Sequence, residues 1–242
     1  MRLNRFIAQS GLCSRRNADV LIQEGRVMLN GKIIKELATQ VEETDTVLVD
    51  GRPLPKLTET TIMLNKPRGY LCSHHDPFHE KTVYELLPEN LRHLDMAGRL
   101  DKDSEGMLIL SSNGNLLLEL THPRYEHFKV YEVEVRGNVH PNEIEQLKNA
   151  PFELDGYQLK PMYAEVIGTK PGSTQLKITL GEGRKRQIRR VMDLLGHRVL
   201  YLRRIQVGKL GLGNLALGAF RHLDIHDINA LISTDRKSTQ RS

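Results

Sequence analysis

A short polar segment between two glycines, GRLDKDSEGMLIL at residues 98–110, carries the residue types that enzymes use for acid–base or nucleophilic chemistry. It holds three carboxylates, Asp101, Asp103 and Glu105, and runs directly into an apolar strand. The glycine at each end lets the backbone approach a ligand closely, and such a loop can direct one carboxylate into a cleft. Judged by spacing alone, an ordinary polar turn is the more frequent explanation of such a segment.

A second segment, EGRKRQIRRVMDLLGH at residues 182–197, joins an arginine-rich loop to the start of a helix. Arg189 and Arg190 fall on the opening turns, where free backbone N–H groups already favour anions. Arg189 follows Ile188, which the helical pattern places toward the core, so we expect it to point partly inward. An inward guanidinium needs a carboxylate partner. The alternative is an amphipathic helix with a charged outer face.

Positive charge is concentrated in two parts of the chain. The whole chain has 35 Lys and Arg against 30 Asp and Glu. Residues 1–35 hold seven basic and two acidic side chains, a net charge of +5, and residues 181–210 hold nine and two, a net charge of +7. This distribution favours a polyanionic partner, and accidental clustering on solvated faces is the alternative.

The composition excludes several classes of protein. The 242 residues are 39% hydrophobic and 27% charged, which is typical of globular domains. No apolar run approaches the ~18 residues of a membrane span, and Arg5 and Gln9 interrupt any secretory signal. Two cysteines, Cys13 and Cys72, build no disulfide framework, so we expect a reducing cytoplasm. Phosphate-loop and metal-ligand motifs are missing, so we expect no metal and no cofactor.

The positioning elements begin with a module at residues 1–51. Ser14 is a suitable N-cap for a helix that stops near Gly25. In VMLNGKII, the Asn30-Gly31 pair suits a type I′ turn between two apolar strands. This pattern predicts a small α/β module.

A linker and a larger domain follow. Residues 52–60 contain two prolines and predict a linker, residues 61–232 predict the second domain, and residues 233–242 predict a disordered tail. Strands are expected at 107–110, 130–135, 163–167 and 174–180, and helices at 115–123, 141–147 and 186–196. Because this order lacks a regular strand–helix–strand rhythm, we expect an α+β fold with a mixed, mostly antiparallel sheet flanked by helices and loops.

Taken together, these motifs resemble the RNA pseudouridine synthases. GRLDKDSEG resembles the family signature G-R-L-D-x-x-[ST]-x-G, and NKPRGYLCS (65–73), KVYEVEV (129–135) and the arginine-rich segment stand in the family's order. The segment RLNRFIAQSGLCSRRNADVLIQEGRVMLNGK resembles the S4 RNA-binding module at the front of the bacterial ribosomal-RNA branch. The resemblance extends over roughly residues 2–224.

The resemblance implies an enzyme that isomerises a specific uridine of ribosomal RNA to pseudouridine, with the large subunit slightly favoured over the small one. The glycosidic carbon–nitrogen bond breaks, the uracil rotates and a carbon–carbon bond forms, so the family needs no cofactor. The target nucleotide must leave any helix, so base flipping is expected. The implied partner is ribosomal RNA or a ribosome assembly intermediate, with no membrane, and a monomer is expected.

The resemblance also assigns residues. Asp101 matches the catalytic aspartate, Tyr131 the active-site tyrosine, and Arg189 the basic residue that pairs with the aspartate. Leu202 and Arg99 match the substrate pocket. Asp101 would act as a nucleophile on the anomeric carbon or as a base on the sugar, and the resemblance leaves both open. The candidate RNA contacts are Arg2, Arg5, Arg15, Arg16, Arg26, Lys32, Lys66, Arg184, Lys185, Arg186, Arg203 and Arg204.

Two other functions stand as alternatives. A non-catalytic RNA-binding protein would keep the scaffold and the basic stretches but would lack a catalytic residue, and none is missing. A carboxylate-dependent glycosidase needs two opposed carboxylates, and only Asp101 is well placed by the motif. Asp103 and Glu105 match no catalytic position, so we expect them to be exposed loop residues.

Overall fold

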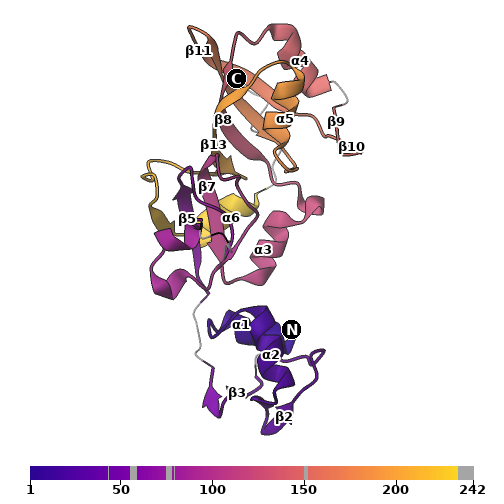
Figure 1. Cartoon of the computed structure of the whole chain (residues 1–242), viewed down its shortest axis with the longest axis vertical. Helices are drawn as coiled ribbons and strands as arrows, with labels where there is room; N and C mark the ends of the chain where they lie inside the picture. The colour runs from indigo at the N-terminus through magenta and orange to yellow at the C-terminus, as the bar shows by residue number, and fades with distance from the viewer. Residues whose placement is uncertain (43, 55–58, 75–77, 79, 150–151, 234–242) are drawn as a thin grey trace. The chain divides into compact units, whose positions relative to one another are not determined.

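The chain consists of two compact units (Figure 1). The computed structural model describes residues 1–42, 44–54, 59–74, 78, 80–149 and 152–233. The first unit contains residues 1–60 and 89–95, and the second contains residues 61–88 and 96–242. The middle of the expected linker, 55–58, and the expected tail beyond Ser233 lie outside the described residues.

The first unit packs two helices, α1 (Leu3–Gln9) and α2 (Arg15–Gln23), against a four-stranded sheet in the order β2-β1-β3-β4. The strands are β1 Val27–Leu29, β2 Lys32–Ile34, β3 Val47–Val49 and β4 Arg52–Pro53. The Ser14 hydroxyl accepts a hydrogen bond from the Asn17 backbone N–H at 3.2 Å, which confirms the expected cap. Asn30 and Gly31 have φ values of 49° and 81°, the pair of positive angles that a type I′ turn requires.

The second unit is built on one large sheet whose main path is β11-β12-β8-β13-β7-β5-β15, with β14 paired to β13 and β6 to β7. Neighbours on this path pair antiparallel except β13 and β7, which are parallel. The expected mixed, mostly antiparallel sheet is therefore confirmed. Its strands are β5 Thr61–Lys66, β6 Asp95–Met96, β7 Glu105–Ser111, β8 Lys129–Arg136, β11 Tyr163–Lys170, β12 Ser173–Leu180, β13 Val199–Val207, β14 Leu210–Gly211 and β15 Phe220–His222.

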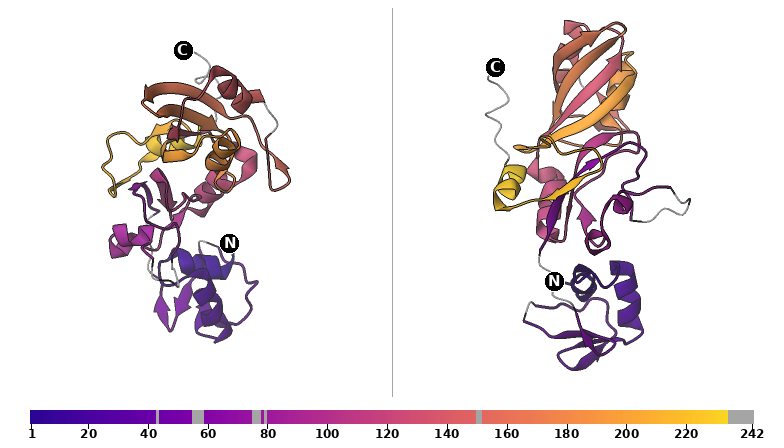
Figure 2. Two further views of the ribbon diagram at one scale, coloured as in Figure 1. Left: turned by 45° about the horizontal axis from the view of Figure 1, so that its top comes forward. Right: turned by 90° about the vertical axis from the view of Figure 1, so that its left-hand side faces the viewer.

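The helices cover this sheet in two groups (Figures 1 and 2). Helices α4 (Pro141–Asn149) and α5 (Gln187–Leu194) share a hydrophobic core with β8, β12 and β13. Helices α3 (Gly114–Thr121) and α6 (Ile225–Ile232) share a second core with β5 and β7. A short hairpin, β9 (Glu153–Leu154) with β10 (Tyr157–Gln158), and three one-turn 3-10 helices at Val83–Leu86, Glu89–Leu91 and Pro123–Tyr125 complete the described elements.

Strand β13 is central to the sheet although its residues do not read as a strand. Two adjacent arginines, Arg203 and Arg204, interrupt its apolar positions. Arg204 is nevertheless buried, because its Nε donates a hydrogen bond to the Met107 carbonyl of β7 at 2.8 Å. A buried guanidinium with a backbone acceptor is compatible with a central strand.

Candidate active site

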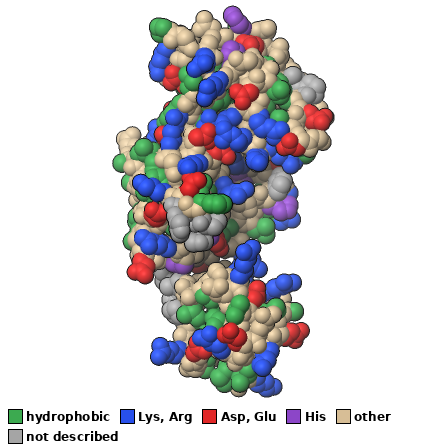
Figure 3. Space-filling view, in the orientation of Figure 1, with side chains coloured by type: hydrophobic (Ala, Val, Ile, Leu, Met, Phe, Trp, Pro, Cys, Tyr) green, Lys and Arg blue, Asp and Glu red, His purple; other side chains and the backbone are tan. Residues whose placement is uncertain are grey.

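A cavity of about 670 Å³ opens in the second unit. Its lining includes the end of α3, the start of α5 and the facing sides of β8 and β13, and Lys and Arg side chains gather around the hollow (Figure 3). Its charged lining residues are Arg99, Lys129, Arg184, Lys185, Arg186, Arg204 and Asp101. Within the described part of the chain, Asp101 is thus the only carboxylate in a strongly cationic cavity.

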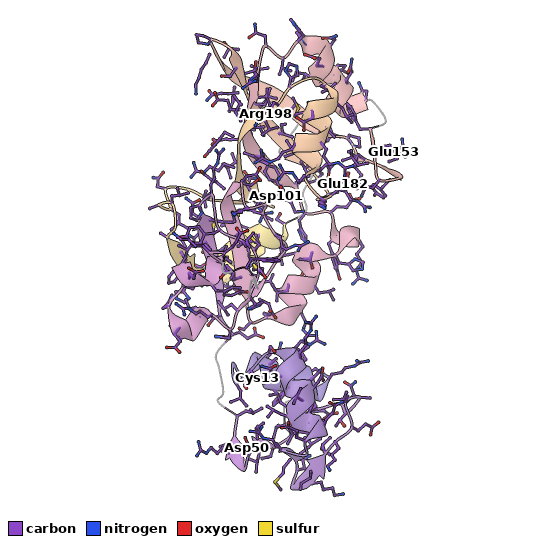
Figure 4. The ribbon with its side chains drawn as sticks, viewed as in Figure 1. Cys13, Asp50, Asp101, Glu153, Glu182 and Arg198 are labelled. Atoms are coloured by element: carbon purple, nitrogen blue, oxygen red, sulfur yellow. The ribbon has the colours of Figure 1, made fainter. Side chains whose placement is uncertain are left out.

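Asp101 lies in the loop between β6 and β7, in the middle of the second unit (Figure 4). Its side chain is 34% exposed, and its Oδ2 lies 3.7 Å from Nη1 of Arg186. Tyr131 on β8 and Leu202 on β13 are buried in the wall of the same cavity, and Arg99 borders it from the loop. The structure therefore brings these four predicted site residues to one cavity.

Lys66, expected to contact RNA, lies underneath the Asp101 loop. Its side chain has 0% exposure at the end of β5. Its Nζ donates hydrogen bonds to three backbone carbonyls of this loop, Asp101 at 3.0 Å, Lys102 at 3.5 Å and Ser104 at 2.8 Å, and to the Pro67 carbonyl at 3.1 Å. The assignment of Lys66 as an RNA contact is wrong, because a buried ammonium that satisfies three loop carbonyls organises the loop from inside.

Gly106 has a different purpose from the one expected of it. Its φ is +104°, and a Cβ at this position would lie 2.2 Å from the carbonyl oxygen of Arg204. Glycine at this position therefore allows β7 to lie close to the backbone of β13. The expected close approach was to a ligand. Gly98 lines the cavity and has a φ of +79°, with open space where a Cβ would lie.

Arg189 points inward and finds a carboxylate, but the carboxylate is Asp103. Its side chain is 9% exposed, and its Nε lies 3.4 Å from Oδ2 of Asp103. Its Nη2 donates to the Asp103 carbonyl at 2.9 Å and to the Ser104 hydroxyl at 3.2 Å. Burial lowers the pKa of Arg189, and the charge of Asp103 opposes that shift. Arg189 is outside the cavity lining, so it braces the loop that carries Asp101.

Asp103 is more than an exposed loop residue. Its side chain is 48% exposed, but Arg186 binds both of its oxygens, at 3.0 and 3.1 Å. Partial burial acts to raise the pKa of this carboxyl, but the hydrogen bonds from Arg186 and the charges of Arg189 and Arg186 outweigh it and hold the pKa below its usual value.

Glu105 is not the exposed loop residue that the sequence predicted. Its side chain is only 14% exposed, because residue 105 already belongs to β7 and lies against β13. It accepts a hydrogen bond from the Tyr201 hydroxyl at 3.0 Å and lies 3.4 Å from Nε of Arg68. It is therefore a partnered carboxylate of the sheet and not a loop residue.

Two cavity residues were missed or misassigned at the sequence level. Lys129 is the first residue of β8 and lines the cavity. Tyr131, two residues later on the same strand, lines it as well. Its Nζ donates to the His127 carbonyl at 2.9 Å, and burial together with the charge of Arg204 lowers its pKa to about 8. The two-residue period of a strand could have found Lys129. Arg204, expected to hold a phosphate at the surface, is instead a buried part of the cavity wall.

The remaining candidate RNA contacts lie at the surface or close to it. Arg184, Lys185 and Arg186 are exposed at the cavity rim, where the Arg184 guanidinium lies 3.4 Å from the centre of the Tyr157 ring. Arg203 is half-buried on β13. In the first unit, Arg5 is half-buried and the exposed candidates are Arg2, Arg15, Arg16, Arg26 and Lys32. Arg26 is already paired with Asp50 at 2.7 Å and Glu24 at 3.2 Å.

Neither a metal cluster nor a membrane span is found in what the structure describes. No group of three or more His, Cys, Asp and Glu side chains there is arranged to hold a metal ion. No described helix combines the length and the apolar character needed to cross a bilayer. Cys13 and Cys72 are free thiols.

A cationic cavity that holds one carboxylate, an aromatic ring and an apolar wall defines an enzyme that works on a polyanion. Comparison with known proteins specifies this class. Residues 60–194 match the family described as RNA pseudouridylate synthase, and residues 1–53 match the S4 domain. The chain belongs to the RNA pseudouridine synthase family and carries an S4 domain at its N-terminal side.

Similar proteins cover almost the whole chain. An uncharacterized RNA pseudouridine synthase of Aquifex aeolicus is 38% identical over 226 residues, which is 93% of this chain and 90% of the relative. The ribosomal large subunit pseudouridine synthase B of Bacillus subtilis is 33% identical over 232 residues, 95% of each chain. A crystal structure of a pseudouridylate synthase has a TM-score of 0.70 at 28% identity, covering 96% of this chain and 99% of the other. The resemblance drawn from the sequence is confirmed.

Proposed function

We propose that this protein converts a specific uridine of ribosomal RNA to pseudouridine, with the large subunit favoured as its target. The similarity to the Bacillus subtilis large-subunit synthase over 95% of both chains supports this choice of RNA. The basic helical face of the first unit, with Arg15 and Arg16 exposed on α2, supports RNA contact outside the cavity. The proposed partner is ribosomal RNA or an assembly intermediate, bound by a monomer in the cytoplasm.

Asp101 is the proposed catalytic carboxylate. Both routes for this reaction, attack on the anomeric carbon and removal of a sugar proton, need an ionised carboxylate at the ribose. Asp101 is the candidate for this role because it is the one carboxylate in the described cavity lining. This observation carries the proposal.

The uridine enters the cavity as a flipped nucleotide. A carboxylate on the cavity wall does not reach a sugar inside a stacked helix, so the nucleotide must leave the stack. A volume of about 670 Å³ is sufficient for one nucleotide. The Tyr131 ring offers a stacking surface worth about 1–3 kcal/mol per base, while the exposed loop 184–186 at the rim supplies charge for the flanking phosphates.

The test replaces Asp101 with asparagine. We expect Asp101→Asn to abolish conversion, measured as tritium release from RNA labelled at C5 of uridine, while RNA affinity stays within about threefold because the amide keeps the size of the carboxyl. Asp193→Asn, an exposed aspartate of α5, is the matched control and should turn over at the wild-type rate. Turnover by Asp101→Asn, or an unchanged pseudouridine map of ribosomal RNA from cells without the gene, would contradict the proposal.

A further inference from the structure

Two cationic side chains line the cavity and have no part in positioning Asp101. Lys129 and Arg204 project from the adjacent strands β8 and β13, and the charge of Arg204 acts on Lys129. Within the described chain, Lys129 donates one hydrogen bond, to the His127 carbonyl, and Arg204 donates one, to the Met107 carbonyl. An ammonium has three N–H donors and a guanidinium five, so both retain donors for a ligand in the cavity.

The proposed reaction produces an anion in this cavity. When the bond between C1′ and N1 breaks, its electron pair stays on the base, and the uracil carries a negative charge spread over N1, O2 and O4. The base must remain in place while it rotates until C5 faces C1′. A negative charge enclosed away from water needs fixed positive partners, and such partners lower the barrier to the step that creates the charge.

We propose that Lys129 and Arg204 form the subsite that holds the detached uracil as an anion, with the Lys129 ammonium as a catalytic residue of the isomerisation. This inference rests on the proposed function and adds the residues that receive the leaving base. The electron pair of the C1′–N1 bond moves to the uracil while Asp101 either bonds to C1′ or takes a sugar proton. When C5 bonds to C1′, the Asp101–C1′ bond breaks or the sugar proton returns, and the proton lost from C5 balances the one gained at N1. Lys129 stays protonated throughout and acts by its charge.

If the charge of Lys129 stabilises the uracil anion, the rate of conversion must depend on pH. Burial and the charge of Arg204 lower the pKa of Lys129 to about 8, so the ammonium is present below this pH and lost above it. The rate should therefore be level below pH 8 and fall above it. The titratable and charged groups around Lys129 begin with Arg204 on β13, Tyr131 on β8, and His127 in the same chain segment with Glu119 of α3 near it. Around the cavity they are Arg99, Asp101, Cys72, Arg184, Lys185 and Arg186.

The experiment compares Lys129→Met, Lys129→Arg and the control Lys177→Met in the full-length protein. Lys177 lies on β12 in an exposed ion pair with Glu165, outside the cavity lining. Conversion is measured in single turnovers at saturating labelled RNA from about pH 6 to pH 9.5, beside the RNA Kd and the melting temperature. We expect Lys129→Met to be at least about 100-fold slower, the usual cost of removing one charge-stabilising donor, with Kd within about threefold.

Lys129→Arg keeps the charge at every pH tested, because a guanidinium does not lose its proton in this range. We expect it to retain at least about a tenth of the wild-type rate and to lose the fall above pH 8. Any alkaline change in the RNA itself would appear in both proteins and cancel in the comparison. Lys177→Met should match the wild type.

Three results would overturn the inference. The first is a Lys129→Met variant that converts uridine at the wild-type rate. The second is a wild-type rate that rises through pH 8, which would mean that the neutral amine acts as a base. The third is a Lys129→Arg variant that is inactive or shows the same fall in rate at alkaline pH. If Lys129→Met melts far below the wild type, the comparison of wild type with Lys129→Arg decides. A wild type that converts no uridine would instead refute the proposed function.

Discussion

Two aspartates, Asp101 and Asp103, stand in one loop but have opposite surroundings. Asp103 takes the bidentate bond of Arg186 and the buried guanidinium of Arg189. The Asp101 side chain has a longer ion pair with Arg186, at 3.7 Å, and borders the cavity. The stronger ion pairs therefore hold Asp103, which braces the loop. The carboxylate of Asp101 is held less tightly and is available to a substrate.

A pH-dependent stability prediction follows for Asp103. Its pKa is lowered in the folded state, so its ionised form stabilises the fold above the usual carboxyl pKa, and this contribution disappears as pH falls through the lowered value. We expect Asp103→Asn to lose on the order of 1 kcal/mol at pH 7, a small value because solvent screens the half-exposed pair. The loss should be smaller at pH 3 than at pH 7, because protonation of the carboxyl at acid pH removes its ion pairs. Thermal denaturation at both pH values measures it, with Asp193→Asn as control, and equal melting temperatures at pH 7 would refute the brace.

At the scale of elements, the contact between β7 and β13 decides where the site forms. These strands are the one parallel pair on the main path, with Arg203 opposite Glu105 and Arg204 opposite Gly106. The Asp101 loop ends where β7 begins. On its other side β13 pairs with β8, which carries Tyr131. The distance between the Asp101 loop and the Tyr131 ring therefore depends on how closely these two backbones approach.

Gly106→Ala should open this contact. The added Cβ would lie 2.2 Å from the Arg204 carbonyl oxygen at a φ of +104°, so the strands must separate or the variant must misfold. We expect a loss of more than about 3 kcal/mol of stability, or no folded protein.

Gly98→Ala is the matched control, because its Cβ would meet open space and only the positive φ of +79° would cost stability, about 1 kcal/mol. Circular dichroism melting curves of the two variants give the comparison. Equal melting temperatures would show that the close approach of β7 and β13 does not limit stability.

At the scale of the whole molecule, each unit has its own basic surface. The second unit concentrates its cations around the cavity, while no described residue of the first unit lines the cavity and α2 of that unit exposes arginines. This division suggests that the S4 domain contributes to RNA affinity and the second unit to the chemical step.

The double variant Arg15→Ser, Arg16→Ser tests this division. We expect weaker RNA binding and a plot of log affinity against log salt that is shallower by about 1–2, because each lost phosphate contact reduces the slope by about 0.7–0.9. The single-turnover rate at saturating RNA should be unchanged. Arg136→Ser, an exposed arginine at the end of β8, is the control. A slower chemical step at saturation would contradict the division.

The amino-acid sequence by itself determined the features that depend on neighbouring residues. The Ser14 cap, the Asn30-Gly31 turn and the helix around Ile188 follow from local conformational preferences and apolar spacing, and the structure contains each of them. The motif that carries Asp101 is equally local. The family, the α+β fold and four residues of the cavity, Asp101, Tyr131, Leu202 and Arg99, could therefore be predicted without coordinates.

Only the tertiary structure decided which side chains meet across the sheet. Lys66 lies 35 positions before the Asp101 carbonyl that it binds, and Arg189 is 86 positions from the Asp103 carbonyl. No local spacing indicates that Lys66 is buried, or that Arg189 selects Asp103. The reason is physical: burial and hydrogen bonding depend on which strands become neighbours, and the parallel contact of β7 with β13 is formed by residues about one hundred positions apart.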